Sequence, residues 1–268
     1  MSWQYLAVAA DAALRAGAIQ KTRFGQELDI RHKGAIDLVT DVDKACEDAI
    51  LAVIRARFGD HDIVTEETHL ERTGARHVWY VDPLDGTVNF AHGYPFFSAS
   101  VAVAVDGVAV AGAVFDPIKE ELFTAERGSG AFLNGKRLRV SMARDLVRSL
   151  LVTGFPYDVH DDVEGKIRLF RRFMGVSRAI RRDGSAALDL CYLAAGRIDG
   201  FWEERLNAWD MAAGNLLVEE AGGRVSRHDG APLELRHDEI VASNGALHEA
   251  MLGVLRAERE ALAAEGRA

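Results

Sequence analysis

One stretch of the chain limits its possible folds more than any other. The segment from Phe96 to Phe115 contains a single charged side chain, Asp106, and is long enough to cross a bilayer as a helix. However, Asp106-Gly107 lies near its centre, between runs rich in valine and alanine, and this dipeptide is typical of a tight hairpin turn. The stretch therefore predicts two buried antiparallel strands over Ser98–Phe115 rather than a helix in lipid.

The predicted elements follow two patterns along the chain. In the first half, two helices are followed by strands and hairpins; the helices are predicted at 3–24 and 41–58 and the strands at 62–65, 77–81, 98–115, 121–125 and 130–140. In the second half, strands at 149–153, 176–181, 198–202, 223–226 and 240–242 alternate with helices at 163–174, 185–195, 209–220 and 247–263. Hairpins followed by alternation predict an α+β half with an antiparallel sheet, residues 1–145, packed on an α/β half, residues 146–268. No linker rich in Pro, Gly or Ser separates the halves, so we expect them to pack closely as a single functional unit.

The charge balance excludes some partners and leaves others open. The formal net charge of −9 argues against non-specific binding to nucleic acid or to an anionic membrane. It does not exclude a phosphorylated substrate, because bound metal ions can reverse the sign of a local site. Cys46 and Cys191 lie in helix-like patterns, which predicts buried thiols rather than a disulfide. No basic segment followed by an apolar one opens the chain, so no secretory signal is visible and we expect a soluble, cytoplasmic protein.

Acidic residues cluster at the ends of predicted strands rather than on a solvated helix face. Glu66-Glu67 and Asp82 each follow a short apolar strand, and Asp210 stands just inside a predicted helix. Pro83 fixes the backbone after Asp82, and Asp85 follows closely, so we expect the two aspartates to converge. Carboxylates without Cys or paired His beside them are hard ligands that favour Mg²⁺ or Mn²⁺ over zinc, and cations would relieve their mutual repulsion.

A simpler interpretation of each aspartate stays open. Asp-Pro and Asp-Gly are common turn dipeptides, and Asp210 has the position of a helix cap. Taken one at a time these residues favour a structural role, whereas taken as an ordered set they favour a metal site. Gly86-Thr87 would then offer backbone N–H groups at a predicted helix N-terminus, which suits a phosphate.

Four sequence blocks resemble the inositol monophosphatase family, within the superfamily that includes fructose-1,6-bisphosphatase. Residues 79–90 match W-x-x-D-P-[IL]-D-G-T-x-N-F, residues 209–214 match W-D-x-A-A-G, residues 37–43 match D-L-V-T-x-x-D, and residues 65–67 match G-E-E with Thr65 in place of the usual Gly. The blocks stand in the family's order, and together they are highly specific. The resemblance implies a layered αβαβα sugar-phosphatase fold, a phosphoric monoester hydrolase activity and a homodimer.

The resemblance also implies a role for each matching residue. The metal ligands would be Glu66, Asp82, Asp85, Asp210 and the carbonyl oxygen of Leu84, holding about two to three Mg²⁺ ions, with Mn²⁺ possible and Li⁺ inhibitory. Catalysis would depend on Glu66, Thr87 and Asp43, where the Thr87 hydroxyl, supported by Asp43, orients the attacking water. The substrate would contact Gly86, Thr87, Asp183, Ser185, Ala186, Glu203 and Asp210, and Lys33 would be the basic residue that the family keeps near the metals.

Three of these residues keep a second interpretation. Thr40 and Asp43 have the spacing of a capping box, which does not exclude contact with Thr87. Lys33 has the alternative of a solvated loop lysine, and Glu203 that of a surface residue.

The chemistry is constrained more tightly than the substrate. Hydrolysis of a phosphate monoester passes through a loose transition state, so positioning and charge neutralisation supply most of the catalysis, with in-line attack by a metal-activated water. Inositol 1-phosphate is the first expectation, because no clear basic cluster stands ready for a second phosphate, although Arg178, Arg181 and Arg182 lie near the pocket. The alternatives are the same reaction on histidinol phosphate, fructose 1,6-bisphosphate or phosphoadenosine phosphate and, from another class, a non-catalytic partner in a transcription complex.

Overall fold

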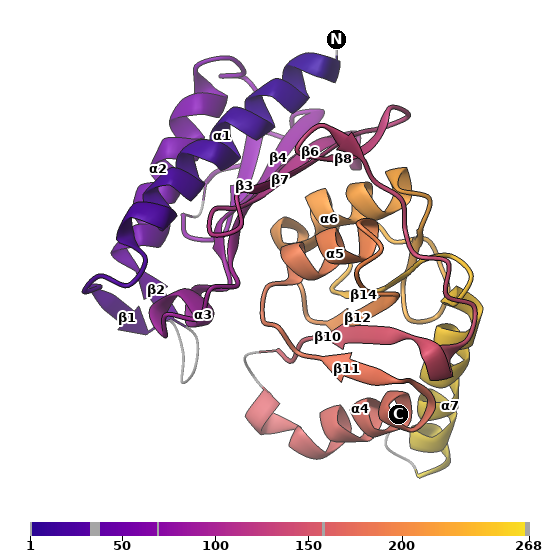
Figure 1. Cartoon of the computed structure of the whole chain (residues 1–268). Helices are drawn as coiled ribbons and strands as arrows, with labels where there is room; N and C mark the ends of the chain where they lie inside the picture. The colour runs from indigo at the N-terminus through magenta and orange to yellow at the C-terminus, as the bar shows by residue number, and fades with distance from the viewer. Residues whose placement is uncertain (1, 33–37, 69, 157–158, 266–268) are drawn as a thin grey trace.

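The chain folds into layers that alternate between helices and sheets (Figure 1). Two helices cover one face of a seven-stranded sheet, two more lie between this sheet and a five-stranded sheet, and a third pair covers the outer face of the second sheet. In this order the pairs are α1 (Ser2–Arg23) with α2 (Asp41–Arg55), α5 (Ala186–Ala194) with α6 (Ala208–Glu220), and α4 (Val163–Val176) with α7 (His248–Ala264). This computed structural model describes residues 2–32, 38–68, 70–156 and 159–265, and it confirms the predicted αβαβα fold.

The seven-stranded sheet runs in chain order. Its strands are β3 (Asp62–Thr65), β4 (His77–Asp85), β5 (Ser98–Val105), β6 (Val108–Asp116), β7 (Glu121–Glu126), β8 (Gly130–Leu133) and β9 (Lys136–Arg137). β3 pairs with β4 in parallel, and the other neighbours are antiparallel. Asp106 and Gly107 join β5 to β6 with φ angles of 52° and 81°, the left-handed backbone of a tight hairpin turn. The apolar stretch is thus a buried hairpin, and in the described residues no helix combines the length and apolar character that crossing a membrane requires.

The five-stranded sheet is mixed rather than fully parallel. Its order is β11-β10-β12-β14-β13, with β10 parallel to β11 and β12, and β14 antiparallel to β12 and β13. The strands are β10 (Leu150–Thr153), β11 (Ala179–Arg181), β12 (Gly200–Glu204), β13 (Arg224–Ser226) and β14 (Glu239–Ser243). Because β10 and β12 run in the same direction, Thr153 and Glu203 reach the same edge of the sheet, beside the cavity described below.

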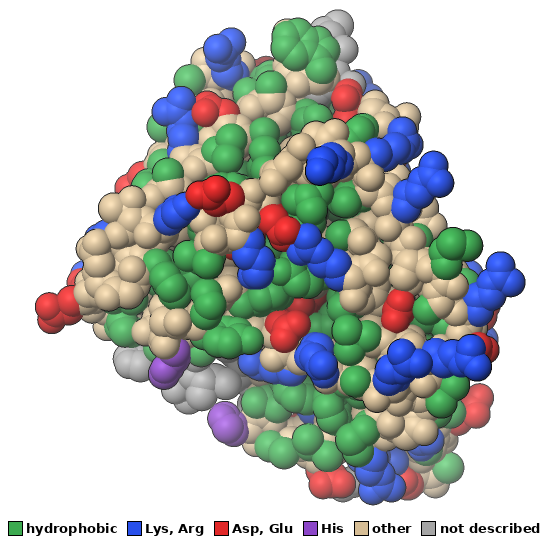
Figure 2. Space-filling model, in the orientation of Figure 1, with side chains coloured by type: hydrophobic (Ala, Val, Ile, Leu, Met, Phe, Trp, Pro, Cys, Tyr) green, Lys and Arg blue, Asp and Glu red, His purple; other side chains and the backbone are tan. Residues whose placement is uncertain are grey.

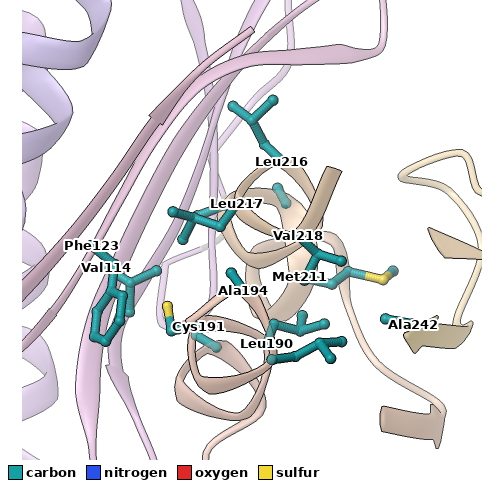
Figure 3. Packing of buried hydrophobic residues seen from close by; sticks show 14 of the residues in the cluster. Val114, Phe123, Leu190, Cys191, Ala194, Met211, Leu216, Leu217, Val218 and Ala242 are labelled. Atoms are coloured by element: carbon teal, nitrogen blue, oxygen red, sulfur yellow. The ribbon is translucent and has the colours of Figure 1, made fainter. Parts of the chain in front are cut away.

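The middle layer of helices forms the largest part of the hydrophobic core. Figure 3 shows Cys191 of α5 and Leu217 of α6 on the side of Val114 and Phe123 from the seven-stranded sheet, with Leu190 of α5 on the side of Ala242 of β14. Each fully buried aliphatic side chain of this kind contributes about 1.5–3 kcal/mol. The core therefore fixes α5 and α6 against both sheets.

A glycine allows α6 to approach the seven-stranded sheet closely. A Cβ at Gly112 of β6 would lie 3.1 Å from the Cα of Ala213.

Both cysteines are buried and free, as the sequence predicted.

The sequence predicted most elements but not all of their limits. The strand predicted at 130–140 is divided by Asn134-Gly135, whose positive φ angles of 47° and 77° form a turn, and β9 ends at Arg137. The strand predicted at 176–181 begins only at Ala179, because α4 continues through Val176. The short strands β1 (Ile30–His32) and β2 (Leu38–Thr40) and the 3₁₀ turns Leu146–Arg148 and Val159–Asp161 were not predicted, whereas the short helix α3 (Thr87–Ala91) begins where a helix N-terminus was expected.

Candidate active site

The acidic cavity begins where strand β4 loses its regular pairing with β5. The register shifts between Asp82 and Asp85, on either side of Pro83 and Leu84. Pro83 has no N–H for the sheet, and the Leu84 N–H donates to Asp82 Oδ1 at 3.0 Å instead. Asp82 and Asp85 are 2% and 8% exposed and line the same cavity, so the predicted convergence of these two aspartates agrees with the structure.

Gly86 and Thr87 turn the chain from β4 into α3. Gly86 has a φ of 92°, and a Cβ there would lie 2.9 Å from the carbonyl oxygen of Phe96, so both the backbone and the space require glycine. The buried Thr87 Oγ1 lies 3.0 Å from Asp43 Oδ1 and 2.9 Å from the carbonyl oxygen of Leu84. One hydroxyl proton is therefore shared between two acceptors, and this fixes the orientation of the Thr87 side chain.

Asp43 fulfils both of the roles that its spacing suggested. Its Oδ2 accepts hydrogen bonds from the Thr40 N–H at 2.8 Å and from the Thr40 hydroxyl at 2.6 Å, which closes the capping box of α2. Its Oδ1 remains available to Thr87. Burial raises the pKa of Asp43 above its usual value, against the effect of these hydrogen bonds.

Two further carboxylates of the cavity are held by the helices of the middle layer. Asp85 Oδ2 accepts hydrogen bonds from the Ser185 hydroxyl and, at 2.9 Å, from the Ala187 N–H, which joins the end of β4 to the first turn of α5. Asp210 Oδ2 accepts from the Asn207 N–H at 2.6 Å. Asp210 thus caps its helix, as the simpler interpretation proposed, and also lines the cavity.

The structure gathers most of the predicted site residues around one cavity of about 230 Å³. The predicted residues in its wall are Glu66, Asp82, Leu84, Asp85, Gly86, Thr87, Ser185, Ala186, Glu203 and Asp210. Asp43 lies behind Thr87 instead of in the wall. Asp183 is not among the lining residues, and its contact with the substrate stays a prediction. Lys33 lies outside the described residues.

Sequence reasoning assigned no role to three other residues in the wall of the cavity. Asn89 belongs to a quoted motif, and its Nδ2 donates to the carbonyl oxygens of Phe96 and Asp183, both at 2.8 Å, so it connects α3 to the segment before α5. Asp189 is the only charged residue of α5, and this isolation in an apolar helix was the signal that would have identified it. Gly154 follows β10 and lies against the Glu203 carboxylate, a contact that no motif announces.

The carboxylates of the cavity hold their protons unusually tightly. Burial raises the pKa of Asp82 well above its usual value, and repulsion from Glu66, Asp85 and Asp210 raises it further. Burial also raises the pKa of Asp85 to about 6, although hydrogen bonds from Ser185 and Ala187 oppose the shift. The pKa of Asp210 is raised well above its usual value by burial, with Glu66 and Asp85 adding to the effect and the hydrogen bond from Asn207 opposing it. Negative charge at this place is costly unless a cation balances it.

The donor chemistry of the cavity fits a hard divalent cation. The described residues of the wall offer carboxylate and carbonyl oxygens and include no Cys or His, which is the donor set that Mg²⁺ prefers over zinc. Within the described ranges no three Asp, Glu, His or Cys side chains already form a closed metal-binding group. One oxygen each of Asp82, Asp85 and Asp210 instead accepts a hydrogen bond from an N–H or hydroxyl donor.

Comparisons with known proteins agree with this arrangement. A family model described as the inositol monophosphatase family matches residues 2–260. The inositol-1-monophosphatase of Synechocystis sp. is 42% identical over 255 residues, covering 94% of this chain and 89% of that protein. The Nus factor SuhB of Escherichia coli (strain K12) is 44% identical over 256 residues, covering 94% of this chain and 96% of that protein. A solved structure of an inositol monophosphatase from Anabaena is 38% identical, with 95% and 96% coverage and a TM-score of 0.86.

Proposed function

Because the chain belongs to the inositol monophosphatase family, we propose that it hydrolyses inositol 1-phosphate to inositol and inorganic phosphate with the help of Mg²⁺. The family and the relatives make the chain a phosphoric monoester hydrolase. The observation that carries the proposal is the convergence of Asp82, Asp85 and Asp210 beside Gly86-Thr87 in one buried cavity. Such a cavity requires cations to balance its charge, and a phosphate is a ligand that cations would attract.

The metal ions would be held by Glu66, Asp82, Asp85, Asp210 and the carbonyl oxygen of Leu84. When bound, Mg²⁺ supplies charge neutralisation and a lowered pKa for the attacking water. We expect about two to three ions, with Mn²⁺ as a substitute and Li⁺ as an inhibitor.

Thr87 and Asp43 would orient the attacking water. When Thr87 Oγ1 donates its hydrogen bond to Asp43 Oδ1 at 3.0 Å, the lone pairs of Oγ1 are left to accept a hydrogen bond from water. Both side chains are fixed, because Oδ2 of Asp43 is bound to Thr40. The Gly86 and Thr87 N–H groups would bind the phosphate, and Glu66 would assist the water.

The alcohol part of the substrate would contact Ser185, Ala186, Glu203 and Asp210. Burial raises the pKa of Glu203 to about 8, with Asp85 adding to the shift and Arg182 opposing it. A carboxyl group near its pKa can accept a hydrogen bond from a hydroxyl group or donate one to it, which suits a polyol. Asp183 lies in the segment before α5 and is proposed as a further contact.

A panel of substrates tests the substrate assignment. The purified chain is assayed for kcat/KM with inositol 1-phosphate, histidinol phosphate, fructose 1,6-bisphosphate and phosphoadenosine phosphate. We expect inositol 1-phosphate to lead. If another substrate leads by about a hundredfold, a transition-state preference of about 2.7 kcal/mol, the same chemistry serves that substrate and the assignment is wrong.

A second function is favoured by the relatives named Nus factor SuhB, which are up to 45% identical. We propose as an alternative that the chain is a partner in a transcription complex. On the face that Figure 2 shows, basic and acidic side chains are interspersed, which suits contact with protein better than direct binding of nucleic acid. Pull-down of transcription proteins by an Asp85→Asn variant as efficiently as by the wild type would support this role, and absence of capture by both would oppose it.

The family resemblance also underlies three smaller proposals. We expect a homodimer in solution, a cytoplasmic location and no membrane association. Light scattering of the purified chain would test the first, since a monomer at micromolar concentration would contradict it.

A further inference from the structure

One acidic residue in the wall of the cavity has no role in the proposed chemistry. Asp189 lies in the first turn of α5, a helix whose other residues are uncharged. Its neighbours Leu188 and Leu190 are fully buried, and Asp189 itself is 1% exposed. The side chain nevertheless lines the cavity, together with Asp85 and Glu203.

One oxygen of the Asp189 carboxyl group lacks a hydrogen-bond donor within the part of the chain that the structure describes. This oxygen, Oδ1, is buried. By contrast, Asp85 and Asp210 each accept from a backbone N–H. Leaving a buried carboxyl oxygen without a partner is costly, so its position in the wall of a cavity indicates that a ligand supplies the missing partner.

The surroundings of Asp189 limit the chemistry of such a ligand. Burial raises the pKa of Asp189 well above its usual value, and repulsion from Asp183, Glu203 and Asp85 raises it further. Arg182 opposes the shift, but its guanidinium group is an exposed neighbour that stacks over Phe155 at 5.9 Å. An additional phosphate or carboxylate is therefore disfavoured here. A hydroxyl group satisfies a carboxyl group in either protonation state, because it both donates and accepts.

We propose that Asp189 is a specificity-determining residue that hydrogen-bonds a hydroxyl group of the leaving alcohol, and so selects monophosphates of polyols. This inference rests on the proposed function, since it concerns the alcohol side of the same cavity. It adds one residue to the proposed contacts of the alcohol, which are Asp183, Ser185, Ala186, Glu203 and Asp210. Ser185 is the N-cap residue of α5 and Asp189 follows it by four positions, and both residues line the cavity.

The test compares two substrates that share the phosphate and differ in the alcohol. Wild type, Asp189→Ala and Asp189→Asn are assayed with saturating Mg²⁺ on inositol 1-phosphate and on p-nitrophenyl phosphate, which has no hydroxyl group on its ring. We expect Asp189→Ala to lower kcat/KM for inositol 1-phosphate roughly 10- to 100-fold, with p-nitrophenyl phosphate changed by less than about threefold. Asp189→Asn keeps the size of the side chain and one acceptor oxygen, so we expect its kcat/KM for inositol 1-phosphate to lie between those of the wild type and Asp189→Ala.

A neighbouring residue supplies a matched control. Asn215 of α6 also has a buried oxygen, Oδ1, with no partner in the described part of the chain, but it does not line the cavity. Asn215→Ala should change kcat/KM by the same factor for both substrates. Thermal unfolding of all variants separates loss of fold from loss of recognition.

Monodeoxy analogues of inositol 1-phosphate identify the hydroxyl group concerned. For the analogue that lacks the hydroxyl bound by Asp189, wild type and Asp189→Ala should give the same kcat/KM, whereas they should differ for the others.

The outcomes separate the two levels of the proposal. If the wild type hydrolyses p-nitrophenyl phosphate but not inositol 1-phosphate, the proposed substrate is wrong and this assignment falls with it. Suppose instead that the wild type prefers inositol 1-phosphate and that Asp189→Ala lowers kcat/KM equally for both substrates, or for neither. Only the role of Asp189 is then overturned. If the selective loss appears with ethanolamine phosphate instead, Asp189 binds an ammonium group and the hydroxyl assignment is wrong.

Discussion

The two ends of the cavity hold their buried carboxyl groups in different ways. At the end near β4, Asp85 and Asp210 each accept a hydrogen bond from a backbone N–H, and Asp43 is held by Thr40. At the end near α5 and β12, Asp189 Oδ1 has no partner among the described residues. Glu203 there lies against the backbone of Gly154. The first end is fixed before any ligand arrives, whereas the second has hydrogen-bonding capacity left over.

This difference matches a division between reaction and recognition. A reaction common to many substrates benefits from groups that need no rearrangement, because preorganised charges lower the barrier most effectively. Recognition of one alcohol is strongest where a polar group gains its partner only from the right ligand. Variants at the two ends should therefore differ in which kinetic constant they change.

The largest effect is expected at the fixed end. Asp85→Asn removes a proposed metal ligand, and we expect kcat to fall on the order of 1,000-fold for every monoester, because charge neutralisation is lost in the transition state. Steady-state kinetics with inositol 1-phosphate and p-nitrophenyl phosphate measure this fall in kcat. Retention of more than about a tenth of the activity would contradict the role of Asp85.

Asp62→Asn is the matched control for that variant. Asp62 is also buried and accepts hydrogen bonds from Thr73, Gly74 and Ala75, but it lies outside the cavity. We expect a lower Tm and a kcat within about twofold of the wild type.

The second effect concerns Thr87. Thr87→Ala removes the hydroxyl group between Asp43 and Leu84, and we expect kcat to fall about 100-fold with little change in KM. Thr87→Ser keeps the hydroxyl and should lose less than about fivefold. Equal losses in the two variants would mean that the hydroxyl group has no part in the reaction.

The third effect tests the end that is proposed to bind the alcohol. A Cβ at Gly154 would lie 2.0 Å from Glu203 Oε1, so Gly154→Ala must displace the flexible end of that side chain. We expect kcat/KM to fall about tenfold for inositol 1-phosphate and less than about twofold for p-nitrophenyl phosphate. Gly175→Ala, at a position with open space around it, is the control and should change neither. A uniform loss on both substrates would remove the distinction between the two ends.

The smallest effect is a pH-dependent stability. The raised pKa values of Asp85, about 6, and Glu203, about 8, mean that the folded state binds these protons more tightly than the unfolded chain. In excess chelator, stability should therefore fall as the pH rises from about 4 to about 8 and then level off. Mg²⁺ binds the ionised carboxylates, so its addition should raise Tm by several degrees more at about pH 8.5 than at about pH 5. Scanning calorimetry measures both shifts, and a Mg²⁺ effect that is the same at the two pH values would count against a metal site here.

The sequence predicted the fixed end of the cavity better than the other end. Asp82, Asp85 and Asp210 stand in contiguous motifs, and the ordered set identified them even though each had a simpler interpretation. The simpler interpretations are also correct in part, since Asp43 and Asp210 do cap their helices while Asp43 contacts Thr87 and Asp210 lines the cavity. Residues of this kind can be predicted from the sequence because they belong to short contiguous motifs and also follow the local rules of helix capping.

The alcohol end was harder to predict because its contacts are long-range. Gly154 follows β10 and Glu203 belongs to the neighbouring strand β12, far away in the sequence, and no spacing rule connects the two residues. Asp189 was missed because an apolar helix with one acidic residue has no motif to announce it. The short strands β1 and β2 were missed for a related reason, since three residues are too few to show a periodicity.

The release of inorganic phosphate from inositol 1-phosphate, after treatment with chelator and as Mg²⁺ is added back, tests the proposed function most directly. We predict no release in excess chelator and a rising, saturable rate as Mg²⁺ is restored, with Asp85→Asn inactive throughout. Full activity in excess chelator, or no release at any Mg²⁺ concentration from a folded chain, would contradict it.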